Sequence, residues 1–384
     1  MTRISPTDEN TDQTNESIAL INPTDLTKEQ SIFLKEFLEG DDQPEVFLPD
    51  TIYTYKQIQF KLTHELNWRL GKDGVSECFE VMKNSRAGVG KYATVDNIEG
   101  KLVSFSKELE FAPAHKKPHK ERVRKFMFFK QDKEEEQWRD SIKKEYKRTK
   151  QAGHLNVRKP VFFRDNAGKL CAYMFIKKAS GATLHDILHG KSNVQLDIET
   201  RKTISIAILN AYIEQVESKG LVHNDISLKN IMIDISNPKQ PIVTFIDFAF
   251  AKKTHKNDAG PNIRGTPLYM APERFVGEGS STASDVFALG HILAELFGER
   301  RITPGPKWGI KEIYGLNKKG TFDSDLIYLE EFEKDTITHN LLPMVSPNPE
   351  ERPTPEEIKE ILMAEYESSS ESTLNTSIEF LHNL

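Results

Sequence analysis

From residue 78 onward, the apolar residues of this 384-residue chain change their spacing near residue 178. Between Cys78 and Ile176 they form short runs separated by turn residues, which is typical of β-strands. One strongly charged stretch, 132–151, interrupts these runs and is itself predicted to be a helix. After Ser180 the apolar residues recur mostly at helical spacing. A small sheet followed by a larger helical region predicts an α+β fold. We expect strands over 79–82, 92–98, 101–106, 122–130 and 170–176, and helices over 184–188, 198–219, 284–297, 335–342 and 355–367.

The segments that flank this region have a different composition. Residues 1–26 are rich in Thr, Asn, Asp and Glu, which predicts disorder. Thr27 and Gln30 have the spacing of a helix capping box ahead of an apolar run that ends near Gly40. A second amphipathic helix is expected over 55–70. We therefore predict a small helical extension over 27–77, and a flexible, Ser- and Glu-rich tail over 367–384.

Composition narrows the class of protein. The 52 Lys and Arg against 58 Asp and Glu give a net charge of −6, which argues against non-specific nucleic-acid binding. The two cysteines, Cys78 and Cys171, form neither a disulfide framework nor a metal-ligand pattern. The sequence contains no run of 18 or more apolar residues, so no membrane span is predicted. The N-terminus lacks the apolar core of a signal peptide. We expect a reducing, cytoplasmic-type compartment.

Three polar segments suggest chemistry. Gly88–Val95 lies between two predicted strands, and its glycines would let backbone N–H groups approach a polyphosphate, although a plain hairpin is the simpler interpretation of this segment alone. Asp225 and Asn230 lie on a loop between a helix and an apolar strand, where they could accept a hydroxyl proton and bind a metal ion. Asp247 follows the next apolar strand and is a candidate Mg²⁺ ligand. Each acidic residue taken alone is more often a turn or a cap.

A fourth segment, Gly-Thr-Pro-Leu-Tyr-Met-Ala-Pro-Glu at 265–273, completes the set in a specific order and spacing. With it the sequence resembles the eukaryotic-type protein kinase family over residues 78–366. The resemblance implies a bilobal fold with an N-lobe over 78–178 and a C-lobe over 179–366. It also implies an enzyme that uses ATP and Mg²⁺ to phosphorylate Ser or Thr hydroxyls of a protein substrate.

The resemblance assigns roles residue by residue. Asp225 corresponds to the catalytic base, and Asn230 and Asp247 to the Mg²⁺ ligands. Lys130 corresponds to the strand lysine that binds the α- and β-phosphates, and Glu145 to its partner on the charged helix. The remaining ATP contacts are assigned to Gly88, Gly90, Tyr92, Val95, Ile176, Lys177, Ala179 and Met232.

Two of these assignments have alternatives. Phe128 stands two residues before Lys130, where the family carries a small residue against the adenine. If the strand register is shifted, Lys125 is the strand lysine and Val123 is the small residue. Glu134, Glu135 and Glu136 compete with Glu145 as the partner of the lysine.

The sequence departs from the family at the catalytic loop. The Arg before the catalytic Asp is replaced by Asn224, so phosphorylation of the activation segment is not expected to be the switch. The catalytic Lys two residues after Asp225 is replaced by Ser227, and Lys229 is a partial substitute. Thr266 is expected to form a hydrogen bond with Asp225. The resemblance also assigns a buried ion pair to Glu273 and Arg352, and it assigns Asp285 to bracing the loop that carries Asp225.

Two further features extend or compete with this interpretation. A basic insertion over 111–125 suggests a binding site for an acidic or phosphate-rich partner, against the simpler interpretation of a solvated loop. The tail over 367–384 resembles the secretion tails of kinases that bacterial pathogens export into host cells. The alternatives to an active protein kinase are a pseudokinase scaffold and a kinase-fold enzyme that acts on a lipid or small molecule.

Overall fold

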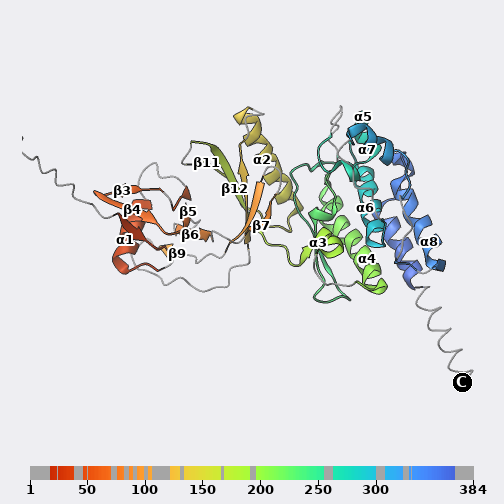
Figure 1. Ribbon diagram of the computed structural model, residues 1–384, viewed down its shortest axis with the longest axis horizontal. Helices are drawn as coiled ribbons and strands as arrows, with labels where there is room; N and C mark the ends of the chain where they lie inside the picture. Colours follow the sequence, from red (N-terminus) through yellow and green to blue (C-terminus); the bar gives the residue numbers. More distant parts are fainter. Residues whose placement is uncertain are drawn as a thin grey trace, which may run out of the picture. The chain divides into compact units, whose positions relative to one another are not determined.

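The computed structural model describes most of the chain in two compact units (Figure 1). Unit 1 comprises residues 1–131 and 160–176, and unit 2 comprises residues 132–159 and 177–384. The boundary between Ile176 and Lys177 lies at the predicted hinge, but residues 132–159 belong to unit 2, unlike in the predicted N-lobe. The described residues are 18–23, 25–38, 46–49, 51–70, 76–81, 86–89, 93–98, 103–105, 122–129, 134–165, 168–190, 196–254, 263–299, 308–322, 328–329 and 331–367.

Unit 1 contains a five-stranded sheet with the strand order β11-β12-β10-β8-β7, in which the pairs β11–β12, β10–β8 and β7–β8 are antiparallel. The predicted strands over 92–98, 122–130 and 170–176 are confirmed as β8, β10 and β12. The short strands β7 and β11 were not predicted. The strand bounds are Arg86–Val89 (β7), Ala93–Ile98 (β8), Arg122–Phe128 (β10), Val161–Arg164 (β11) and Leu170–Lys177 (β12).

The N-terminal part of unit 1 is a mixed α/β structure. Helix α1 (Lys28–Leu38) begins at the predicted capping box, since the N–H of Gln30 donates to Oγ1 of Thr27 and the N–H of Thr27 donates to Oε1 of Gln30. Two small sheets accompany it, with the orders β1-β4-β3 and β2-β5-β6-β9. Their strands are Ala19–Ile21 (β1), Val46–Phe47 (β2), Tyr53–Tyr55 (β3), Ile58–Leu62 (β4), Glu65–Leu70 (β5), Ser76–Val81 (β6) and Val103–Phe105 (β9).

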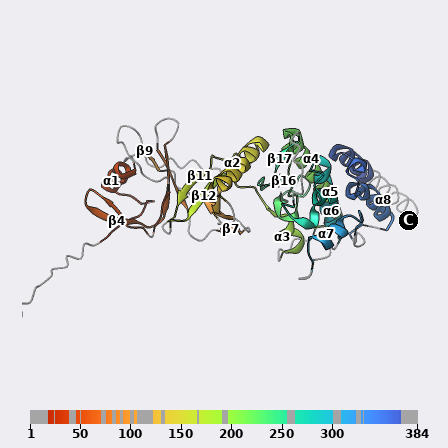
Figure 2. The same ribbon diagram turned by 90° about the horizontal axis from the view of Figure 1, so that it is seen from above.

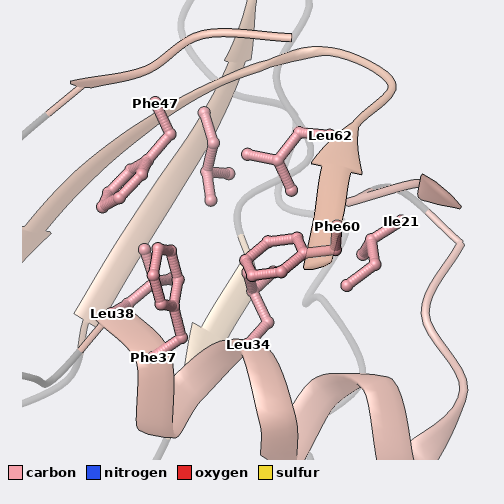
Figure 3. Close-up of a cluster of buried hydrophobic side chains, with 8 residues drawn as sticks. Ile21, Leu34, Phe37, Leu38, Phe47, Phe60 and Leu62 are labelled. Atoms are coloured by element: carbon pink, nitrogen blue, oxygen red, sulfur yellow. The ribbon is translucent and has the colours of Figure 1, made fainter. Parts of the chain in front are cut away.

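The helix predicted over 55–70 is wrong, because β4 and β5 occupy this segment. Lys56 and Gln57 adopt positive φ angles of 48° and 64°, which makes a tight turn between β3 and β4. Beyond the turn, Phe60 and Leu62 alternate with more exposed residues and are buried against α1. Figure 3 shows this core, in which Phe37 and Phe60 meet edge to face with ring centroids 5.0 Å apart.

The extension is joined to the five-stranded sheet by apolar and ionic contacts. Val46 packs in one cluster with Tyr173 and Phe175 of β12. Arg124 of β10 is buried and forms an ion pair with Glu65 of β5. The N-terminal residues are therefore an integral part of unit 1.

Unit 2 is mainly helical and is built around a buried helix, α6 (Thr282–Leu296). Every residue of α6 from Ser284 to Leu296 is buried, as expected for a helix that is apolar on most sides. α6 contacts both α4 (Ile198–Gln215) and α8 (Glu331–Leu341), as can be followed in Figure 1 and Figure 2. The other helices are α2 (Glu135–Ala152), α3 (Leu184–His189), α5 (Pro272–Val276), α7 (Ile310–Asn317) and one over residues 355–367.

The strands of unit 2 are short and frame the loops that carry the polar motifs. β13 (Ala182–Thr183), β15 (Ile231–Asp234) and β16 (Ile242–Phe245) form one antiparallel sheet. β14 (Leu221–Val222) pairs with β17 (Lys252–Lys253). The α+β prediction is confirmed. No helix among the described residues is long and apolar enough to cross a membrane.

Candidate active site

Residues 222–230, here called the Asp225 loop, connect β14 to β15 and are shaped by a carboxylate from α6. Asp285 accepts hydrogen bonds from the backbone N–H of His223 at 2.6 Å and of Asn224 at 2.9 Å, and from the Tyr212 hydroxyl at 3.1 Å. Burial raises the pKa of Asp285 to about 6. Asn224 takes a left-handed conformation with φ of 66°, which turns the chain at the residue before Asp225. The predicted bracing role of Asp285 is confirmed.

The Asp225 carboxylate is held from two sides. The backbone N–H and the hydroxyl of Thr266 each donate to its Oδ1 at 2.8 Å, and the Asn230 amide donates to its Oδ2 at 3.0 Å. The predicted contact between Thr266 and Asp225 is confirmed. Burial raises the pKa of Asp225 to about 6, the charge of Asp247 acts in the same direction, and the three hydrogen bonds oppose both. Such a group is ionised at neutral pH and has a pKa close enough to accept a proton there.

His223 is a buried neutral partner of Asp225. Its Nδ1 accepts from the backbone N–H of Asp225 at 3.4 Å, so the ring proton lies on Nε2, which faces the carbonyl oxygen of Ile246 at 3.1 Å. Burial lowers the pKa of His223 to about 4. The ring of Phe248 packs on it with centroids 4.9 Å apart. These contacts attach the Asp225 loop to the segment that carries Asp247.

Asn230 and Asp247 have the chemistry of a magnesium site. Asp247 follows β16 with a φ of 64°, and the N–H of Ile246 donates to the carbonyl oxygen of Asn230 at 2.9 Å. The Asn230 amide nitrogen donates to the carbonyl oxygen and to Oδ2 of Asp225, so its amide oxygen takes no part in these two bonds and could bind a cation. The described residues contain no cluster of three or more His, Cys, Asp or Glu side chains suited to a metal ion. A small set of hard oxygen donors fits Mg²⁺, which keeps waters and binds substrate phosphates.

Whether Lys125 or Lys130 corresponds to the strand lysine depends on the register of β10 against β8. Lys125 lies directly opposite Val95 of β8, and residues opposite each other share one face of the sheet. Lys125 is 9% exposed. Lys130 lies outside the described residues, beyond the end of β10 at Phe128. The structure thus places the alternative, Lys125, on the same face as the residue assigned to the adenine.

The other predicted ATP contacts are placed only in part. Gly88 lies on β7 next to Val95, and Gly90 and Tyr92 lie outside the described residues. Ile176 and Lys177 end β12. Ala179 follows this strand and is half-buried, and Met232 pairs with Thr183 in the sheet of unit 2.

Glu145 stands apart from its competitors on the charged helix. It is 7% exposed and shares the buried face of α2 with Ile142 and Thr149, whereas Glu134 and Glu136 are exposed. A carboxylate at a buried helix position is costly unless it has a partner. This burial favours Glu145 for a role beyond that of a solvated helix face.

Residues 263–273, here called the Thr266 segment, are anchored in unit 2. Arg352 donates to both carboxylate oxygens of Glu273, at 2.7 Å and 2.9 Å, which confirms the predicted ion pair. The next residue, Arg274, donates to the carbonyl oxygens of Asn224 and Arg264. Arg274 was not predicted from the sequence, because a contact with backbone carbonyls leaves no pattern in the sequence.

The structure describes only some of the residues at which the sequence departs from the kinase family. Ser227, in the place of the catalytic lysine, is 5% exposed, and the nearby Lys229 is exposed. Arg124 and Lys125 are buried in β10, and Arg124 is paired with Glu65, so an acidic partner of the insertion stays a prediction. Residues 111–121 of that insertion and the tail over 368–384 lie outside the described residues.

The protein kinase domain family matches residues 111–365, which is more than half of the chain. The chain belongs to this family. The match begins after Gly88–Val95, so the glycine-containing segment of this kinase chain lies outside it.

The chain is similar to serine/threonine-protein kinases from several organisms. The probable serine/threonine-protein kinase gdt2 of Dictyostelium discoideum is 30% identical over 44% of this chain and 10% of its own length. The serine/threonine-protein kinase ULK1 of Homo sapiens is 25% identical over 46% of this chain and 17% of its own. The serine/threonine-protein kinase Nek8 of Danio rerio is 33% identical over 32% of this chain and 17% of its own. The matches therefore span less than a fifth of each relative.

Proposed function

We propose that this chain is a protein kinase that transfers the γ-phosphoryl group of ATP to a Ser or Thr hydroxyl of a protein. The observation that carries the proposal is the Asp225 carboxylate, held by Thr266 on one oxygen and by Asn230 on the other. Both donors lie in segments that resemble motifs of the kinase family. The names of the relatives support the Ser/Thr acceptor.

In the proposed reaction Asp225 orients the acceptor hydroxyl and takes its proton. The hydroxyl oxygen forms a bond to the γ-phosphorus as the bond from that phosphorus to the β–γ bridging oxygen breaks, and ADP leaves with the electron pair. With a pKa of about 6, Asp225 is ionised at neutral pH and accepts the proton as the hydroxyl loses it. The two Thr266 hydrogen bonds fix the direction in which the carboxylate points.

Asn230 and Asp247 would hold Mg²⁺ through one amide oxygen and one carboxylate. The bound ion neutralises charge on the phosphate oxygens. The Asp225 loop and the Asp247 segment are joined through His223, Phe248 and the Ile246 N–H, so the two ligands are positioned by one hydrogen-bonded unit.

We assign Lys125, rather than Lys130, to the α- and β-phosphates. Lys125 is buried on the face of β10 that it shares with Val95, the residue assigned to adenine. With Lys125 as the strand lysine, Val123 is the small residue two positions before it. Phe128 is then not the residue assigned to the adenine. This removes the steric objection that Phe128 raises against Lys130.

The test is transfer of radiolabel from γ-labelled ATP, with Mg²⁺, to a basic protein mixture. We expect the full chain to label the substrate, and both Asp247→Ala and Asp225→Asn to abolish labelling. Asp197→Asn is the matched control, since Asp197 caps α4 at the surface and Asn caps helices equally well. Labelling that survives Asp225→Asn would refute the assigned base.

Burial of Ser227 in the place of the catalytic lysine favours a second candidate, a pseudokinase scaffold. A scaffold would bind ATP, seen as a rise in Tm with ATP and Mg²⁺, without transferring label. A kinase-fold enzyme for lipids or small molecules would transfer label to those acceptors and leave proteins unlabelled. The same assay with three acceptors therefore separates the candidates.

A further inference from the structure

We propose that Arg274 is a positioning residue that keeps the Thr266 segment against the Asp225 loop without any phosphorylation of the chain. This inference rests on the proposed kinase function and adds how the site is kept in its working arrangement. The contacts that carry it are those of the buried Arg274 guanidinium with the carbonyl oxygens of Asn224 and Arg264.

Arg274 joins the two stretches of chain that meet at Asp225. Its Nη1 donates to the carbonyl oxygen of Asn224 at 2.8 Å, and its Nη2 donates to the carbonyl oxygen of Arg264 at 2.7 Å. Asn224 directly precedes Asp225, and Arg264 precedes Thr266 by two residues. The guanidinium thus connects the same two stretches that the contact between Thr266 and Asp225 connects.

The backbone approaches very closely at this point. Gly265 has a φ of 111°, and a Cβ there would lie 2.8 Å from the carbonyl oxygen of Asn224. Only glycine tolerates both conditions. The Asn224 carbonyl oxygen that accepts from Arg274 therefore also packs against Gly265 of the Thr266 segment.

Arg274 is itself firmly held. It is 5% exposed and lies on α5, next to Glu273, whose carboxylate binds both Arg352 and the Ser284 hydroxyl. Burial lowers the pKa of Arg274, and the carboxylates of Asp285, Asp225 and Glu273 oppose this effect. The guanidinium group is planar and its side chain is already fixed by burial, so it can donate to two carbonyl oxygens at a low entropic cost.

The arginine that precedes the catalytic Asp in the kinase family, and that would bind a phosphorylated residue, is replaced by Asn224 in the Asp225 loop. In its place Asn224 donates its side-chain amide to the carbonyl oxygen of Phe250 at 3.1 Å. A neutral amide used in this way offers no positive charge to a phosphorylated residue. The two hydrogen bonds from Arg274 to the carbonyl oxygens of Asn224 and Arg264, in contrast, are made with backbone and need no modification.

The experiment compares Arg274→Lys with Arg201→Lys in the full chain. Arg201 is a matched control, because it is also buried and also donates to two backbone carbonyls, those of Leu196 and Leu296. Lysine carries a single ammonium and cannot reproduce the two-pronged contact at either place. We measure kcat, the KM for ATP, and hydrogen exchange of the Thr266 backbone N–H, before and after treatment with a protein phosphatase.

We expect phosphatase to change wild-type kcat by less than about twofold. Loss of one charged hydrogen bond corresponds to about tenfold or more in rate, so Arg274→Lys should lower kcat by at least that factor with little change in the KM for ATP. The Thr266 N–H should exchange about tenfold faster in Arg274→Lys. Arg201→Lys should lower Tm and leave both kcat and the Thr266 exchange unchanged.

Loss of activity on phosphatase treatment, or wild-type kcat and Thr266 exchange in Arg274→Lys, would overturn the inference. If the wild type transfers no phosphate at all, the kinase proposal fails by itself, and the Thr266 exchange still decides whether Arg274 holds the segment. Should Arg274→Lys not fold, Arg274→Gln, which can donate to one carbonyl, replaces it with the same readouts.

Discussion

Thr266 donates two hydrogen bonds, one from its backbone and one from its hydroxyl, to the same oxygen of Asp225, each at 2.8 Å. The backbone bond depends on where the Thr266 segment lies, whereas the hydroxyl bond depends on the side chain. Substitutions at Thr266 can therefore separate the two contributions to the orientation of Asp225.

We predict that Thr266→Val lowers kcat about tenfold, because one hydrogen bond to a charged acceptor is lost. Thr266→Ser keeps the hydroxyl and should stay within about threefold of wild type. Steady-state kinetics at saturating ATP measures both. Equal kcat values for the Val and Ser variants would show that the hydroxyl bond does not orient the base.

The short-range motifs of unit 2 were predictable because each is a contiguous pattern with a fixed partner. Thr266 and Asp225, Asp285 and the Asp225 loop, and Glu273 and Arg352 were all paired correctly from such patterns. The β-strand at 58–62 was not predicted. Its hairpin turn uses Lys56 and Gln57 at positive φ rather than glycine or asparagine, so no turn signal separates it from a helix.

The register of β10 could not be read from the sequence either. Lys125 and Lys130 are an odd number of residues apart, so a continuous strand would put them on opposite faces, and only pairing with Val95 selects one. Arg274 was missed for a related reason. Its partners are carbonyl oxygens, which every residue has, so their positions depend on the fold and not on side-chain identity.

The choice between the two lysines can be tested directly. We predict that Lys125→Met abolishes transfer and the rise in Tm caused by ATP and Mg²⁺, because the phosphates lose their cation. Lys130→Met should retain both within about twofold. The reverse pattern, with Lys130→Met inactive and Lys125→Met active, would restore the register assigned from the sequence.

Asp225 should make stability depend on pH in the metal-free protein. Its folded pKa of about 6 lies above its ordinary value of 3.8, so the unfolded chain releases this proton first as pH rises. Between about pH 4 and pH 6 this group therefore lowers the free energy of unfolding, by at most about 3 kcal/mol in total. Above pH 6 its contribution is constant.

We predict that the difference in Tm between Asp225→Asn and wild type shifts in favour of the variant as pH rises from 4 to 6. The test is the change of this Tm difference with pH, and not its absolute size. The NH2 group of Asn replaces one acceptor oxygen, so the variant also loses a hydrogen bond with one of the donors that face Asp225. Thermal unfolding in a pH series without Mg²⁺ measures it. A difference that does not vary with pH would mean that Asp225 titrates near its ordinary value.

The buried ion pair of Glu273 and Arg352 should be far more important for stability than a surface pair of similar length. Arg352→Ala leaves the Glu273 carboxylate buried without its cation, and we expect a loss of about 3–5 kcal/mol in the free energy of unfolding. The control is Lys56→Ala, which removes an exposed pair with Glu36 at 2.8 Å and should cost far less, because solvent screens an exposed pair. Urea unfolding of each variant, followed by circular dichroism, gives both values. Similar losses in the two variants would contradict the burial of the pair, and with it the anchoring of the Thr266 segment to unit 2.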